Sequence, residues 1–270
     1  MKLIDIFEAN FTHIEPKELI GFRKGVQSLI DDIDKGIVPP EASQEHFVSR
    51  DYRTLQFLID NGIKPSEKVQ IAAVGFSHDA LNVLMDNNIK PSKAVQIAAV
   101  ARFPEEVFNN FYKERAIDMP KPVEIAMIKA DPELLIDIDA CEDAKIAGVH
   151  KYGHAISYLK DPPSEAVQIA AVTATSSYKG AYYSIIGPQS RFPAITDPSY
   201  NVRRAALLKY PPNIKYMMKS PIDFFEKLSK DPDVIQRKQL YDTIIKNIYP
   251  NNNLLIKKWI RYGDTMREEL

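Results

Sequence analysis

Two histidines, His150 and His154, are the first candidates for metal chemistry because they lie four positions apart. On a single helix that spacing would place both imidazoles on one face, where they could share a zinc ion. Gly153 lies between them, and the repeat described below places His150 at a break between two helices. The sequence therefore predicts that the two rings do not share a face and do not bind a metal.

Acidic residues cluster in the run DIDACED, from Asp137 to Asp143. Carboxylates of this kind could hold a hard cation, but a calcium loop needs a glycine turn and regularly spaced oxygens, which this run lacks. We interpret it as a solvated connector. The single cysteine, Cys141, excludes an internal disulfide and a cysteine-cluster metal site, and we expect it to be a buried small residue.

Sequence motifs of the common enzyme classes are absent: there is no G-x-S-x-G, no H-E-x-x-H and no glycine-rich phosphate loop. The chain has 10 glycines in 270 residues. Few positions therefore remain for a phosphate cradle or for the special backbone conformations of catalytic sites. We predict a protein that is not an enzyme and uses no cofactor.

The carboxyl-terminal part of the chain is basic. Residues 200–270 hold 14 Lys and Arg against 8 Asp and Glu, whereas residues 1–199 hold 21 against 28. Basic side chains alternate with tyrosines there, a pattern typical of surfaces that bind phosphates and stack bases, and also of a solvated rim. The patch comprises Arg203, Arg204, Lys209, Lys215, Lys219, Tyr200, Tyr210 and Tyr216. Nucleic-acid binding through this region is one alternative function that the sequence suggests, and an enzyme without a recognised motif is the other.

The longest irregular stretch runs from Thr173 to Tyr200 and is rich in tyrosine. Insertions in repeat proteins tend to form loops on one face and often bind partners, although a lengthened connector would look the same. Our candidates for binding a protein partner are therefore Tyr182, Tyr183, Arg191, Phe192 and Arg203. Arg203 is included because we expect it to be open to solvent, whereas we expect Arg204 to be less exposed and either snorkelling or paired with an acid.

The chain contains an internal repeat, which predicts the elements on which these candidate residues lie. The hexamer VQIAAV begins at Val69, Val95 and Val167, and weaker copies begin at Ser43, Val123, Ala144 and Val202. The spacings of 26, 26, 28, 21, 23 and 35 residues are in the range that indicates stacked helical repeats. In five of these seven copies a second apolar pair follows seven and ten residues after the end of the hexamer; the pair shifts by one residue to Phe108 and Phe111 in one copy and is missing after Val172.

Each repeat is predicted to fold as two short helices. Ser66, Ser92 and Ser164 precede the hexamers at the position where a serine oxygen can cap a helix. Apolar residues surround most of the first helix, so we expect it to be sandwiched between neighbours. The apolar pair of the second segment has helical spacing, and prolines such as Pro104 and Pro132 suit its first turn.

Segments of the form P-S-x-A-V-Q-I-A-A-V, found at Pro65–Val74, Pro91–Val100 and Pro163–Val172, resemble the helical repeats of a domain family of unknown function in tailed-phage and bacterial proteins. The resemblance covers roughly residues 40–220. It implies a curved helical array, a phage origin and no established activity. The flanks and residues 173–201 depart from the family's pattern.

Taken together, we predict an all-α fold: an α-solenoid-like array of about seven helical hairpins with capping helices at both ends. Residues 1–42 would form the first cap, 43–220 the array with its insertion near 173–201, and 221–270 the second cap. The expected function is non-enzymatic binding of a host or virion protein. No run of 18 apolar residues and no signal peptide occurs, so we expect a cytoplasmic protein without membrane contact, with a virion location as the alternative.

Overall fold

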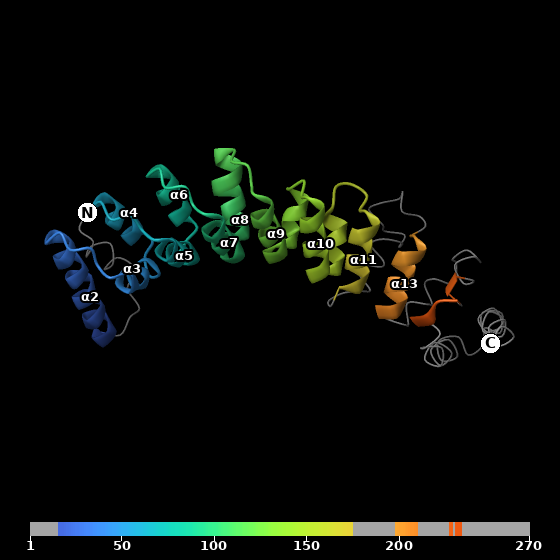
Figure 1. Cartoon of the computed structure of the whole chain (residues 1–270), viewed down its shortest axis with the longest axis horizontal. Coiled ribbons are helices and arrows are strands. Elements are labelled where there is room, and N and C mark those ends of the chain that lie inside the picture. The colour runs from blue at the N-terminus through green and yellow to red at the C-terminus, as the bar shows by residue number, and fades with distance from the viewer. Residues whose placement is uncertain (1–15, 175–197, 210–226, 229, 234–270) are drawn as a thin grey trace. The chain divides into compact units, whose positions relative to one another are not determined.

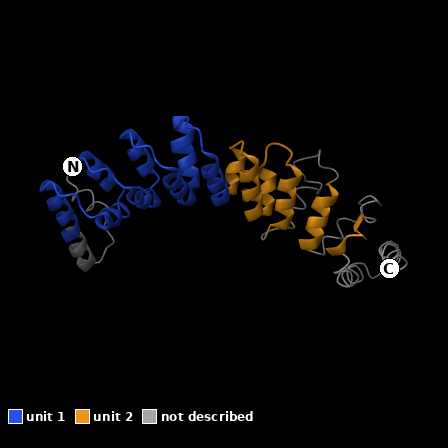
Figure 2. Ribbon diagram, viewed as in Figure 1, with its two compact units in different colours: residues 1–131 blue, residues 132–270 orange. Residues whose placement is uncertain are grey.

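The computed structural model describes residues 16–174, 198–209, 227–228 and 230–233 of the 270-residue chain. Every regular element in these ranges is a helix, which confirms the all-α fold (Figure 1). The chain divides into two compact units, residues 1–131 and residues 132–270 (Figure 2).

Unit 1 is built from pairs of helices. It contains α2 (Pro16–Asp34), α3 (Glu41–Val48), α4 (Arg53–Asp60), α5 (Glu67–Phe76), α6 (Asp79–Asp86), α7 (Lys93–Arg102), α8 (Pro104–Val107) with its π-helical continuation η1 (Phe108–Lys113), and α9 (Lys121–Ala130). The first helices of the repeats, α3, α5, α7 and α9, pack one against the next in a row. The second helices, α4, α6 and α8, lie on one side of that row (Figure 1).

Unit 2 repeats the first helix but shortens the second. It contains η2 (Pro132–Ile136), α10 (Glu142–Lys151), η3 (Gly153–Tyr158), α11 (Glu165–Thr173) and α13 (Tyr200–Lys209). Here the expected second helices are single 3₁₀ turns, η2 and η3. They follow the hexamers with the shortest spacings, 21 and 23 residues, which leave too little chain for an α-helical hairpin with its connectors.

The hexamer builds the core of each repeat. Its first, fifth and sixth positions are completely buried in the clearest copies, for example Val69, Ala73 and Val74 of α5 and Val95, Ala99 and Val100 of α7. The alanines at the fifth position allow the neighbouring helices to approach closely. The apolar pairs Leu55 with Leu58, Leu81 with Leu84, and Ile156 with Leu159 are buried beside them, as predicted.

The shifted apolar pair of the third repeat has a backbone cause. Val107 is buried seven residues after the end of its hexamer, so the first position of the pair has not moved and its assignment to Phe108 was wrong. The chain then enters the π-helix η1, whose wider turn adds one residue, and Phe111 becomes the second buried position.

Helix α2 covers the first repeat. Val26 and Leu29 pack against Phe47 of α3. A β-carbon on Gly25 would lie 3.0 Å from the tip of the Phe47 ring, so a glycine is suited to this close approach. The helix ends at Asp34, and the positive φ of 72° at Gly36 allows the amides of Gly36 and Ile37 to bond back to the carbonyls of the last turn.

The insertion does not interrupt the stacking of first helices. Val202 follows Val167 by 35 residues in the sequence, yet α13 packs directly on α11. Val202, Ala206 and Leu207 are buried at the hexamer positions of α13. The seventh hexamer therefore forms a first helix like the others.

Candidate partner-binding face

Serine caps join successive repeats. The oxygens of Ser66, Ser92, Ser164 and Ser199 accept a bond from the backbone amide three residues later, at the first turn of α5, α7, α11 and α13. Each hydroxyl also donates to a glutamate at the start of the preceding first helix. We call this series the serine ladder; its pairs are Ser66 with Glu41, Ser92 with Glu67, Ser164 with Glu142, and Ser199 with Glu165.

The serine ladder is interrupted at α7 and α9. Lys93 begins α7 at the position where the other helices have glutamate, and Pro120, which has no hydroxyl, replaces the serine before α9. Lys121 begins α9 in the same way, and Cys141 replaces the serine before α10. The amino-terminal positions of α7 and α9 therefore carry positive charge where α3, α5, α10 and α11 have a ladder carboxylate.

Where the second position of the hexamer is a glutamine, its side chain hydrogen-bonds to the turn that precedes the helix. The amides of Gln44, Gln70, Gln96 and Gln168 donate to the carbonyl of the proline five residues earlier. Gln96 also accepts a 2.6 Å bond from the Tyr112 hydroxyl, whose pKa is raised by burial. These glutamines are structural groups that satisfy buried carbonyls.

The third and fourth positions of the hexamer face outward. Ile71 is 36% exposed, and the other isoleucines and alanines at these positions in unit 1 are half-buried. We name the isoleucine and alanine side chains at these positions of α5, α7 and α9 the outer strip: Ile71, Ala72, Ile97, Ala98, Ile125 and Ala126. Helices α5 and α7 each lie between two neighbouring first helices, which confirms the predicted sandwich, and the outer strip is the side that these neighbours leave open.

Unit 2 carries the same pattern at α10 and α11. Ile146, Ala147 and Ile169 are half-buried at the equivalent positions. This face was not predicted from the sequence, because five of the six residues of the hexamer VQIAAV are apolar. The available signal was the period of the helix: Ile-Ala recurs at the third and fourth positions, away from the positions that pack in the core.

The outer strip is edged with cations on α7 and α9. Lys93 and Arg102 lie at the two ends of α7, and Lys121 and Lys129 at the ends of α9, all exposed. Within the described residues, Lys93, Arg102 and Lys129 make no ion pair. The outward positions of these two helices contain no carboxylate.

The two arginines of α13 are arranged opposite to our expectation. Arg203 is buried, with 6% of its surface exposed, and its Nε donates to the carbonyl of Pro198 at 2.8 Å. It takes the place of the hexamer glutamine and does not offer its charge to solvent. Arg204 is paired as expected, to Asp231 and Asp233, but it is the more exposed of the two.

The Arg204 pair includes a tyrosine. The Tyr200 hydroxyl donates to Asp231 at 3.0 Å. Burial, together with this bond, raises the pKa of Tyr200 to about 12. Burial also acts to raise the pKa of Asp231, but hydrogen bonds from Arg204 and Tyr200 outweigh it and leave that pKa below the ordinary value. Three side chains of the basic patch, Tyr200, Arg203 and Arg204, are therefore engaged in internal contacts, which weakens the nucleic-acid alternative.

Most of the other candidates lie outside the described residues. These are Tyr182, Tyr183, Arg191 and Phe192 of the insertion, and Tyr210, Lys215, Tyr216 and Lys219 of the basic patch. The end of the insertion is described and is structural: Pro198, Ser199 and Tyr200 cap and anchor α13. Residues 198–200 therefore belong with the array and cannot be counted as a dispensable loop.

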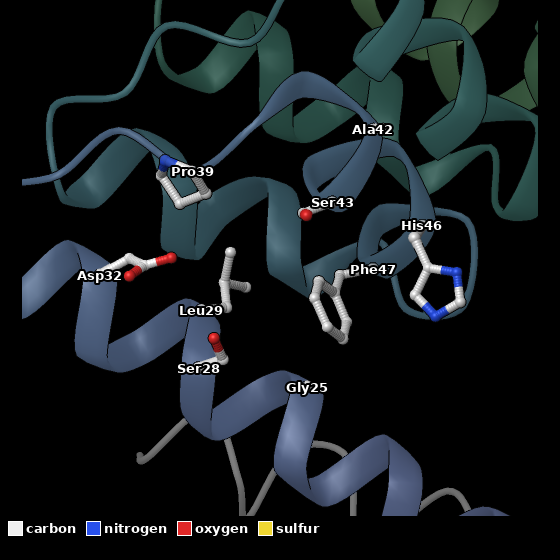
Figure 3. Close-up of a pocket in the computed structure, with 9 residues that line it drawn as sticks. All are labelled: Gly25, Ser28, Leu29, Asp32, Pro39, Ala42, Ser43, His46 and Phe47. Carbon is white, nitrogen blue, oxygen red and sulfur yellow. The ribbon is translucent and has the colours of Figure 1, made fainter.

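A pocket of about 430 Å³ lies between α2 and α3 (Figure 3). Its lining contains Asp32, Ser43 and His46, whose types could form a catalytic triad. Asp32 and His46 lie at opposite ends of the pocket, and no hydrogen bond joins the three side chains in the described structure. The geometry required for proton transfer is not present there.

A second pocket, of about 590 Å³, is lined by residues from the ends of α6 and η1 and from the start of α7. Lys90 and Asp118 are its charged residues, and Gln96, which is held by Pro91 and Tyr112, forms part of its wall. Gln96 therefore already serves the packing of the repeat.

His150 lies in the last turn of α10, and its predicted position at the break between two helices is therefore wrong; His154 lies on a different element, η3. The His154 ring packs near Tyr152 and Tyr158. Among the described residues no group of three His, Cys, Asp or Glu side chains could hold a metal ion. Only the first part of the DIDACED run, up to Cys141, connects η2 to α10; Glu142 and Asp143 form the first turn of α10, and Lys145 lies 3.8 Å from Asp139. None of the described helices is both long and apolar enough to span a membrane.

No protein-family model matches the chain, and searches of curated proteins and of solved structures return no match.

Proposed function

We propose that this protein is a non-enzymatic, macromolecule-binding repeat protein that captures a protein partner on the outer strip of its first helices. One observation carries the proposal: isoleucine and alanine recur at the third and fourth hexamer positions of three neighbouring first helices of unit 1, where Ile71 is 36% exposed and Ile97, Ile125 and the alanines that follow all three isoleucines are half-buried. Partly exposed apolar side chains that gather on neighbouring helices are a common property of protein interfaces.

Packing supports this reading of the strip. The repeats have their completely buried core at the first, fifth and sixth hexamer positions, so the partly exposed isoleucine at the third position buries less apolar surface than those positions do. A solvated helix face would ordinarily carry polar residues there, as Glu45 of α3 does. Repeated apolar residues at an outward position favour a surface that is covered when a partner binds.

The partner class we propose is a protein of a bacterial host or of a virion, with the chain acting in the host cytoplasm or as a virion component. The resemblance of the repeats to a helical family in tailed-phage and bacterial proteins supports this source. We further propose that the insertion, including Tyr182, Tyr183, Arg191 and Phe192, contributes to the same interaction.

The experiment is affinity capture with the full chain as bait, using host lysate and disrupted virions as separate sources. A strip variant, Ile71→Asp with Ile97→Asp, is compared with a control variant, Ile37→Asp with Val38→Asp, which alters two exposed apolar residues of the α2–α3 connector. We expect a protein that is retained by the wild-type and control chains and lost from the strip variant. Identical retention by all three chains would overturn the proposal.

A further inference from the structure

We infer that the part of the outer strip on α7 and α9 binds an acidic amphipathic helix of a protein partner; this inference rests on the proposed function and specifies the chemistry of the ligand. The site consists of Ile97, Ala98, Ile125 and Ala126 with the cations Lys93, Arg102, Lys121 and Lys129 at its two edges. It is apolar in the middle and positive on both sides.

The dimensions fit a helix laid across the row. Lys93 and Arg102 are nine residues apart on α7 and Lys121 and Lys129 eight residues apart on α9, which places the two cation rows about 12–14 Å apart along the helix axes. An α-helix with its side chains is about 10–12 Å wide. A helix lying over the isoleucines would therefore bring acidic residues on both of its flanks to the two rows.

Small side chains form most of the surface between the two cation rows. Ala98, Ala101 and Ala126 lie there, and the isoleucines are the larger apolar side chains among them. Small residues of this kind allow a second helix to approach closely, while Ile71, Ile97 and Ile125 on successive helices could fill spaces between its apolar side chains. The pattern repeats with the distance between packed helices, about 8–10 Å.

The interrupted serine ladder is an independent indication of the same place. At α5, α10 and α11 the first residue is a glutamate that binds the serine of the next repeat. At α7 and α9 it is Lys93 and Lys121, and the next repeat has no serine. The two exposed lysines reverse the charge of the edge where the ladder stops.

A protein ligand fits this surface better than a nucleic acid. The space between the cation rows is lined by aliphatic side chains, which offer no hydrogen bond to a sugar or phosphate and no ring to stack on a base. An apolar stripe flanked by carboxylates satisfies both features of the surface. Charge complementarity would also set the orientation and speed of association.

The test measures binding of fluorescein-labelled 18-residue peptides to the full chain by anisotropy. An acidic amphipathic helix with leucines on one face and glutamates on both flanks is compared with the same peptide carrying Gln for Glu, with the same peptide carrying Ser for Leu, and with single-stranded DNA. The chains are wild type, the edge variant Lys93→Glu with Lys129→Glu, and the strip variant Ile97→Asp. A matched control, Lys35→Glu with Lys64→Glu, makes the same charge change at exposed positions elsewhere in unit 1.

We expect the acidic amphipathic peptide to bind wild type at least tenfold more tightly than the Gln or Ser peptide. The edge variant should lose at least tenfold in affinity and the control variant less than threefold, and a peptide with Lys for Glu should recover binding to the edge variant. Circular dichroism of every variant confirms that a loss is not due to unfolding.

Other outcomes would overturn the inference in distinguishable ways. Equal binding of the Gln and Glu peptides, with loss of both in Ile97→Asp, would leave the proposed strip in use but contradict the acidic ligand. Equal binding of the Ser and Glu peptides, or tighter binding of DNA, would indicate a general polyanion surface. Unchanged peptide binding in Ile97→Asp would contradict both the inference and the proposed use of the strip.

Discussion

The hydroxyl of Ser92, which caps α7, donates a hydrogen bond to the carboxylate of Glu67 at the start of α5. One serine thus stabilises its own helix and joins it to the preceding repeat. Replacing Ser92 by Ala should cost about 1–2 kcal/mol of unfolding free energy, because it removes a cap and a bond to a charged group. Urea denaturation of Ser92→Ala, Glu67→Ala and the double variant measures the coupling between them, which we expect to be about 0.5–1 kcal/mol.

A second cycle is the control. It combines Ser92→Ala with Glu41→Ala. These two residues are not bonded to each other, because Glu41 accepts its hydrogen bond from Ser66. Their effects should be additive. Additive effects of Ser92→Ala and Glu67→Ala would show that the bond between repeats contributes nothing to stability.

Thr54 should be replaceable with a gain in stability. Its side chain is completely buried at the start of α4, and its hydroxyl has no hydrogen-bond partner in the described structure. Thr54→Val keeps the shape and removes the unsatisfied group, so we expect about 1 kcal/mol of stabilisation. Thermal unfolding of Thr54→Val beside Thr54→Ser checks this; destabilisation by valine would mean that the hydroxyl is satisfied in solution.

Arg203 should be exchangeable for the residue that the other repeats use. Gln70, Gln96 and Gln168 make the same bond to a proline carbonyl that Arg203 makes to Pro198. We therefore expect Arg203→Gln to change the unfolding free energy by less than about 1 kcal/mol. Arg203→Glu should cost about 3 kcal/mol or more, because it places a buried carboxylate beside a carbonyl oxygen. Equal denaturant midpoints for the two variants would contradict the assigned register of α13.

The Arg204 and Asp231 pair predicts a specific dependence of stability on pH. The folded pKa of Asp231 lies below its unfolded value of about 4. The stability contributed by its carboxylate is therefore fully present above the unfolded pKa and is lost as the pH falls through the folded pKa. We expect wild type to exceed Asp231→Asn by about 1–3 kcal/mol at pH 6, and the difference to shrink between pH 4 and pH 2. A difference that is constant over that range in urea titrations would contradict the ion pair.

Whether the sequence predicts the position of a residue depends on whether local or distant contacts determine it. The caps at Ser66, Ser92 and Ser164 and the buried hexamer positions were predictable, because local helix geometry determines them. The burial of Arg203 was not, since its partner is a backbone carbonyl five residues earlier that becomes available only when the turn has formed. The shift at Phe111 depends on a π-helix, which no spacing rule had included.

The candidate site was harder to predict than the fold. The sequence drew attention to unusual residues, the tyrosine-rich insertion and the basic patch, whereas the outer strip consists of the most ordinary ones. Ile71 and Val74 look alike in the hexamer, but Val74 is buried between helices and Ile71 is not. Only the packing of the first helices separates the two roles.

The most direct test of the central claim is methyl NMR of the full chain labelled at the isoleucine δ1 carbons, titrated with the acidic amphipathic peptide. The account predicts that the resonances of Ile71, Ile97 and Ile125 shift with a single dissociation constant, while those of the buried Ile128 and Ile156 stay within the spectral linewidth. Shifts confined to other isoleucines, with those three unchanged at saturating peptide, would contradict the claim that partners bind on the outer strip.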